Sequence, residues 1–205
     1  LLTYDYLARP ARLIPNTITK MPQISADGKT YTFHLKKHIW FFPDPIFKGK
    51  KRELTAMDYS YTIKRLLDPS NRSPSAIFLR GKIMGLDALA QKAEKSGHFN
   101  YDIPIAGLKT PNRYTLKIRL NAPDPNFLYV LAYGALGAVA REAIEGYGIQ
   151  APFHPVGTGP YHLSEYVPRS RIVLEANPYF RGFIWNFQST GDTCDNQLVQ
   201  DMYGK

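Results

Sequence analysis

DGKTYTFHLKK, residues Asp27–Lys37, contains the clearest strand pattern in this chain. It opens with Asp27-Gly28, a pair typical of tight turns. Beyond the turn, apolar and polar residues alternate, with Tyr31, Phe33 and Leu35 set against Thr32, His34 and Lys36. Because successive side chains of a strand point to opposite faces of a sheet, this alternation predicts a half-buried strand with one face on a core.

The next regular segment, Glu53–Pro69, reads ELTAMDYSYTIKRLLDP and predicts a helix. Thr55 and Asp58 have the spacing of a capping box, with Asp in place of the usual Glu or Gln. The apolar residues that follow recur at helical spacing, at Tyr59, Ile63, Leu66 and Leu67. Asp68-Pro69 should end the helix, since the residue before a proline resists the helical region.

Arg113–Leu120, RYTLKIRL, alternates in the same way and predicts a second one-sided strand. Asp124 and Pro125 then supply an N-cap and a first-turn proline for the apolar run that follows. Gly134 and Gly137 interrupt that run, so we expect two short helices with an irregular joint. Strands and helices without regular βαβ alternation predict an α+β fold, a mixed sheet with packed helices.

His154–Tyr161, HPVGTGPY, precedes the segments YHLSEY and RIVLEA, which predict a hairpin joined by a turn at VPRS. A phosphate loop would place its glycines between a strand and a helix, and here they lead into a strand instead, which argues against phosphate binding. We expect the glycines to adopt positive φ at a tight connection, so that Gly159→Val would destabilise the chain.

Composition bounds the remaining possibilities. The chain has 205 residues, 44% of them hydrophobic, enough for a sizeable core. No apolar run approaches the roughly 18 residues of a membrane-spanning helix, so we expect a soluble chain, at most peripheral to a membrane. The net charge of +9 favours anionic partners. The densest basic run, Lys48–Arg52, lies among prolines and a glycine and predicts a solvated loop, although an anion-binding interaction module stays open as an alternative.

Motifs for catalysis or cofactor binding are not found. The five histidines lie in separate segments, and those of predicted strands, His34 and His162, fall on the polar phase, which predicts surface positions. Cys194 is the single cysteine, which excludes an internal disulfide and a Cys-rich zinc site. The sequence therefore predicts no enzyme, no metal, no cofactor and no nucleic-acid partner. A hydrolase with its catalytic residues in another part of a longer chain remains an alternative.

Three stretches, taken in order, resemble one family: Asp27–Pro69, Arg113–Ala132 and His154–Gly182. They are similar to the family 5 extracellular solute-binding proteins of ABC importers. The resemblance implies a periplasmic binding protein fold of two lobes (type II, cluster C like), in which residues 1–205 form a fragment of lobe I. Residues from about 20 to 150 would be its smaller α+β subdomain, those from about 151 to 205 the hairpin and the return towards the main sheet, and the second lobe would be absent.

The resemblance also implies a function. The protein would capture a peptide or similar small solute, in the periplasm or at the cell surface, and deliver it to an ABC permease and its ATPase, with no cofactor. The joint Tyr133–Ala138, YGALGA, corresponds to a stretch that faces the cleft in some relatives, so Tyr133, Gly134, Ala135 and Gly137 are the candidate ligand-binding residues. Small apolar residues here, where a nickel-chelate-binding relative has a basic residue, favour a peptide. The alternative is that the two glycines only permit close helix packing.

Overall fold

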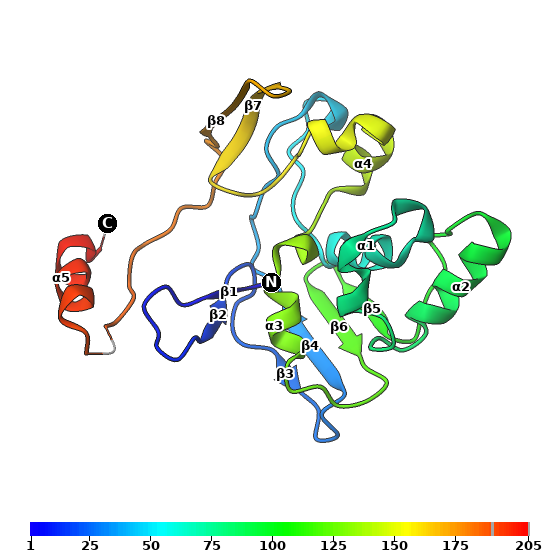
Figure 1. Ribbon diagram of the computed structural model, residues 1–205, viewed down its shortest axis with the longest axis horizontal. Coiled ribbons are helices and arrows are strands. Elements are labelled where there is room, and N and C mark those ends of the chain that lie inside the picture. Colours follow the sequence, from blue (N-terminus) through cyan, green and yellow to red (C-terminus); the bar gives the residue numbers. More distant parts are fainter. Residues whose placement is uncertain (190, 205) are drawn as a thin grey trace.

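A four-stranded antiparallel sheet forms the centre of the computed structural model, which describes residues 1–189 and 191–204 (Figure 1). Its strands follow the order β3 (Gln23–Ile24), β4 (Thr30–His34), β6 (Thr115–Arg119) and β5 (Leu108–Asn112). The two strands predicted from alternation are the central pair. Tyr31 lies opposite Ile118 and Phe33 opposite Leu116, which places all four side chains on one buried face.

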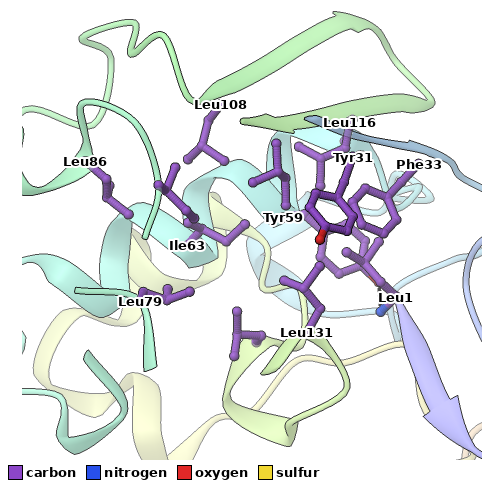
Figure 2. Packing of buried hydrophobic residues seen from close by; sticks show 14 of the residues in the cluster. Leu1, Tyr31, Phe33, Tyr59, Ile63, Leu79, Leu86, Leu108, Leu116 and Leu131 are labelled. Atoms are coloured by element: carbon purple, nitrogen blue, oxygen red, sulfur yellow. Dashed lines mark hydrogen bonds between the residues drawn. The ribbon is translucent and has the colours of Figure 1, made fainter. Parts of the chain in front are cut away.

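Helix α1 (Ala56–Leu67) covers that face, as Figure 2 shows for Tyr59 and Ile63. Its first turn confirms the predicted cap, since the Asp58 carboxylate accepts hydrogen bonds from Thr55 N at 2.7 Å and Thr55 Oγ1 at 2.9 Å. The helix ends at Leu67 with Asp68 as its C-cap, which confirms the predicted end at Asp68-Pro69. The Asp68 carboxylate accepts a hydrogen bond from Ser70 N at 2.9 Å and so caps the short helix after it.

Short helices complete the body. They are η1 (Pro45–Phe47), η2 (Pro69–Asn71), η3 (Pro74–Phe78), α2 (Leu86–Ser96), α3 (Phe127–Leu131), η4 (Gly134–Leu136), α4 (Arg141–Tyr147) and η5 (Gly148–Phe153). The predicted break at Gly134 and Gly137 is confirmed. The predicted start is wrong by two residues, because the Asp124 carboxylate accepts from Asn126 N and thereby caps a turn that precedes α3.

Two hairpins lie outside the central sheet. At the N-terminal end β1 (Leu2–Tyr4) pairs with β2 (Leu13–Pro15). Towards the other end β7 (Tyr161–Val167) pairs with β8 (Arg171–Ala176), which confirms the predicted hairpin. An extended segment then leads to α5 (Thr193–Met202), away from the body (Figure 1). Within residues 1–189 and 191–204, no helix combines the length and apolarity that crossing a bilayer requires.

The connection into β7 corrects the expectation for its glycines. Neither Gly157 nor Gly159 has a positive φ, and a Cβ built on Gly159 would meet its nearest neighbour only at 4.0 Å. Carbonyl groups hold this connection instead. The Gly157 carbonyl accepts from Phe42 N at 2.8 Å, and the Gly159 carbonyl accepts from Nδ2 of the buried Asn177 at 2.8 Å. The backbone reason for expecting Gly159→Val to destabilise the chain is therefore wrong.

Candidate functional site

The joint Tyr133–Ala138 is fixed at both ends by buried groups. Leu131 before it and Leu136 within it are almost fully buried, and Val139 N donates to Oγ1 of Thr62 on α1 at 3.1 Å. Inside the joint, Leu136 N donates to the Tyr133 carbonyl and Gly137 N to the Gly134 carbonyl. All four candidate residues, Tyr133, Gly134, Ala135 and Gly137, are exposed. The joint is thus an exposed surface on a rigid support.

A second exposed aromatic residue lies against the joint. The rings of Phe78, at the end of η3, and Tyr133 meet edge to face, with 5.1 Å between their centroids and 61° between their planes. Phe78 remains 41% exposed and Tyr133 50%, and Ile77 beside Phe78 is 72% exposed. Ile77, Phe78 and Tyr133 are called the aromatic patch below. Leu79 has no exposed surface and so anchors η3 beneath the patch.

Sequence reasoning missed Ile77 and Phe78. The available signal was the run Ile77-Phe78-Leu79, three large apolar residues in a short segment that begins at Pro74. One short turn cannot direct three consecutive side chains into one core, so some of them must face outwards. Which of them do so depends on the packing of Leu79 against the body.

The glycines of the joint do not serve close helix packing at Gly134. A Cβ built there meets nothing within 4 Å, whereas one on Gly137 would come within 3.1 Å of the Gly134 carbonyl oxygen. Gly137 therefore serves the tight turn of the joint itself. Gly134 leaves the backbone open to solvent, where another chain could approach it closely.

A cavity of about 790 Å³ lies elsewhere, in a groove between α1, β5 and α4. Its guanidinium groups have carboxylate partners within the protein. Arg52 binds Asp58 at 2.6 Å and Glu142 at 2.8 Å, so the basic loop Lys48–Arg52 is not solvated at its last residue, contrary to expectation. Arg141 binds Asp102 and Glu145, and these hydrogen bonds raise the pKa of Arg141. We assign the charges of this groove to stability.

A lysine in the same groove is also satisfied internally. The Lys64 ammonium donates to the carbonyl oxygens of Tyr101 and Ile103, both at 2.7 Å. Burial lowers the pKa of Lys64. Within the described residues, no group of three or more His, Cys, Asp or Glu side chains is arranged to hold a metal ion.

A smaller cavity of about 530 Å³ lies beside α3, between Leu128 and Tyr129 on one side and the loop Ala8–Leu13 on the other. The ring of Tyr129 is 6.3 Å from that of Tyr4, and both are partly exposed. Tyr129 lies in the middle of α3, and Tyr133 of the aromatic patch follows four residues later, beyond the end of that helix. The aromatic patch is an exposed surface whose side chains are available for apolar contact.

Comparison with known proteins gives consistent results. Residues 12–193 match the family model described as bacterial extracellular solute-binding proteins, family 5, middle. The periplasmic oligopeptide-binding protein OppA of Escherichia coli (strain K12) is 32% identical over 168 residues, which are 80% of this chain and 27% of the relative. The dipeptide-binding protein of the same organism is 29% identical over 197 residues, 92% of this chain and 33% of the relative.

Two solved structures share the fold. The substrate-binding domain of an oligopeptide ABC transporter from Bacillus anthracis str. Ames has a TM-score of 0.71 at 22% identity, over 88% of this chain and 32% of that one. A periplasmic oligopeptide-binding protein (OppAIV) from Borrelia burgdorferi has a TM-score of 0.68 at 25% identity, over 98% of this chain and 40% of that one. The chain spans about a third of the length of such relatives. These matches confirm the fold class predicted from the sequence.

Proposed function

Because the chain belongs to the bacterial extracellular solute-binding proteins of family 5, we propose that it is part of a receptor that captures peptides for import. The receptor would work in the periplasm or at the outer face of the cell membrane and would present its solute to an ABC permease driven by an ATPase. The names of the relatives support this proposal, since they describe binders of oligopeptides and dipeptides.

The described part of the chain would be one lobe of this receptor, or a piece of that lobe. We assign residues from about 20 to 150, with the central sheet and α1, to the smaller subdomain of lobe I. Residues from about 151 to 205 would return towards the main sheet of that lobe. A second lobe, from the part of the relatives' length that this chain does not span, would form the opposite wall of the cleft.

One observation carries the proposal for the site: the aromatic patch is exposed although its support is rigid. Leu79, Leu131 and Leu136, which are close to Phe78 and Tyr133 in the sequence, are buried in the hydrophobic core, so the exposed rings are attached to a packed support. Exposed apolar groups on a rigid support mark binding surfaces. Aromatic rings supply a large contact area at a low cost in conformational entropy.

The chemistry of the joint fits a peptide better than a compact anion. Tyr133 is its single polar side chain, and the rest of the joint is glycine, alanine and leucine. A peptide would lay an apolar side chain on Phe78 and Tyr133 and its main chain beside Gly134. A metal chelate or small anion would require a fixed cation here, and the joint supplies none.

The test uses the full-length protein that carries this chain, with the bound solute first identified by native mass spectrometry. For a peptide so identified, the double variant Phe78→Ala, Tyr133→Ala should raise the Kd by at least about tenfold, as loss of two aromatic contacts predicts. Calorimetric titration measures the effect. Met57→Ala, an exposed apolar residue on α1 outside the patch, is the matched control and should leave the Kd unchanged.

Two results would contradict the proposal at different levels. An unchanged Kd in the double variant would place the site elsewhere and leave the receptor function standing. A full-length protein that carries no peptide and binds none from a mixed peptide pool would overturn the function itself.

A further inference from the structure

Helix α1 carries polar side chains on the side that does not pack on the sheet. Ser60, Tyr61 and Lys64 lie within one turn of each other on that side and all line the groove between α1, β5 and α4. Tyr59 and Ile63, which pack on the sheet, occupy another side of the helix (Figure 2). The groove therefore has its own set of polar groups, separate from the core.

Two hydroxyl groups of this set have no hydrogen-bond partner among the described residues. Ser60 is 7% exposed and Tyr61 6%. Within residues 1–189 and 191–204, Nε1 of Trp185 is the only fully enclosed side-chain nitrogen or oxygen without a partner. The hydroxyls of Ser60 and Tyr61 are thus not enclosed, and they remain accessible from the groove. Burial raises the pKa of Tyr61, so its hydroxyl keeps its proton and can donate.

The Lys64 ammonium is a buried cation without a counter-ion. Lys64 is 7% exposed, and its Nζ donates to the carbonyl oxygens of Tyr101 and Ile103. These carbonyls are neutral, so they hold the ammonium in place without balancing its charge. Because an ammonium carries three N–H donors, it can bind one more acceptor without losing these two. A buried charge is most stable when it is paired, so the groove favours an anion beside Lys64.

The carboxylates that line the groove are already bound by arginines. Each arginine holds two of them: Arg52 binds Asp58 and Glu142, and Arg141 binds Asp102 and Glu145. Lys109, which is exposed on β5, is a second lysine of the groove that forms no ion pair within the described part of the chain. The groove therefore carries an unbalanced positive charge.

Apolar side chains form the wall of the groove next to β5. They belong to the loop before this strand and to the strand itself, and are Pro104, Ile105, Leu108 and Pro111. The volume of about 790 Å³ is within the range of small-molecule sites, which combine apolar walls with a few polar groups.

We propose that this groove binds a small carboxylic acid with an apolar body, at a site separate from the aromatic patch. The carboxylate would accept hydrogen bonds from Lys64, Ser60 and Tyr61. All three groups can donate, which suits a carboxylate because an ionised carboxylate only accepts. The hydrocarbon part would lie on Ile105 and Leu108. The inference does not depend on the identity of the solute that the receptor imports.

Calorimetric titration of the full-length protein with octanoate tests this site. Two matched probes divide the ligand into its parts, since 1-octanol has the apolar body without the carboxylate and acetate has the carboxylate without the body. We expect octanoate to bind at least about tenfold more tightly than either probe. Equal binding of 1-octanol would overturn the role of the carboxylate, and equal binding of acetate would overturn that of the apolar wall.

The double variant Ser60→Ala, Tyr61→Phe tests the position of the carboxylate. Neither hydroxyl bonds to a described residue, so their removal should leave the fold intact. The Kd for octanoate should rise by about tenfold, as loss of two hydrogen bonds predicts. Tyr203→Phe, at a tyrosine that is 76% exposed and outside the groove, is the matched control and should leave this Kd unchanged.

Absence of octanoate binding, or an unchanged Kd in the double variant, would overturn the proposal. So would loss of octanoate binding in Phe78→Ala, Tyr133→Ala, because octanoate would then occupy the aromatic patch. Octanoate is titrated without added peptide, so failure of the peptide proposal and failure of this one are separate results.

Discussion

Strand β6 of the central sheet and strand β8 of the C-terminal hairpin alternate apolar with polar residues in the same way, but the structure treats them differently. Leu116 and Ile118 of β6 have no exposed surface, whereas Ile172 and Leu174 of β8 are mostly exposed. β6 lies between two strands and under α1, while β8 has one partner strand and no layer above it within the described residues. Alternation selects which face is apolar, and a second layer decides whether that face is buried.

The sharpest test of this difference removes one large side chain from each region of the 205-residue chain. Phe33→Ala should lower the free energy of unfolding by about 4 kcal/mol, because it opens a cavity in a packed core. Leu174→Ala should change it by less than about 0.5 kcal/mol, as expected for an exposed site. Urea unfolding measures both, and similar losses would show that the two regions do not differ as the structure indicates.

Charged groups provide a second contrast. Arg52 links α1 to α4, because its guanidinium binds both Asp58 of α1 and Glu142 of α4. The Asp58 side chain is 2% exposed. Arg52→Met should cost about 3 kcal/mol, since it leaves that carboxylate buried without its partner. The hairpin pair of Arg171 and Glu165 is exposed, so Arg171→Met should cost less than about 1 kcal/mol. Thermal unfolding of the two variants compares them, and a larger loss for Arg171→Met would contradict the assignment of Arg52.

Replacing a glycine by alanine should also affect the stability of the two regions differently, by smaller amounts. A Cβ on Gly107 in the body would lie 2.4 Å from the Met84 carbonyl oxygen, a backbone atom that cannot move aside cheaply. Gly107→Ala should therefore cost about 2 kcal/mol. Gly159→Ala, at the entrance to the hairpin, should be neutral or stabilising by up to about 1 kcal/mol, because it meets no close atom and restricts the unfolded chain. A clear loss of unfolding free energy in Gly159→Ala would show that the backbone at Gly159 is constrained, as the sequence predicts.

The smallest expected effect is a pH dependence that arises from Glu53 in the body. Burial alone would raise the pKa of Glu53, but hydrogen bonds from His38 N, Tyr114 and Arg113 hold it below its usual value. This carboxylate therefore contributes stability that is fully present above its unfolded pKa of about 4.3 and is lost as the pH falls through the lower folded value.

Glu53→Gln should make the decline in unfolding free energy on acidification shallower. Tyr114→Phe, which removes one of the donors, should act in the same direction and less strongly. Denaturant titrations between about pH 6 and 3 follow the slope. An unchanged slope in Glu53→Gln would show that the hydrogen bonds to this carboxylate do not distinguish the folded chain from the unfolded one.

Much of the body could be predicted because its signals are local. The alternation at Tyr31 and Phe33, the cap at Thr55 and the stop at Asp68-Pro69 each depend on residues that are close in sequence. The positive φ expected at Gly159 was wrong because that conformation depends on distant partners, here the side chain of Asn177. The same holds for His162. Its position in β7 predicts a surface side chain, but in the structure its ring stacks on Phe42, which is distant in the sequence.

The candidate site divides in the same manner. Tyr133, Gly134, Ala135 and Gly137 were found from a resemblance, and they remain proposed ligand contacts. Phe78 lies 55 residues before Tyr133 in the sequence, so no local pattern connects the two rings. Their contact follows from the packing of η3 and η4 against α1, which fixes both turns through the buried residues Leu79 and Leu136.

Local sequence patterns were enough to predict the two central strands, helix α1 with its cap and its end, the break at Gly134 and Gly137, and the C-terminal hairpin. These depend on periodicity, capping and turn residues, all of which act over a few positions. Burial of the apolar faces, pairing of the charges and exposure of the aromatic rings could be read only from the packed structure. Those outcomes depend on what packs against each face, and burial is a property of two surfaces that no single segment encodes.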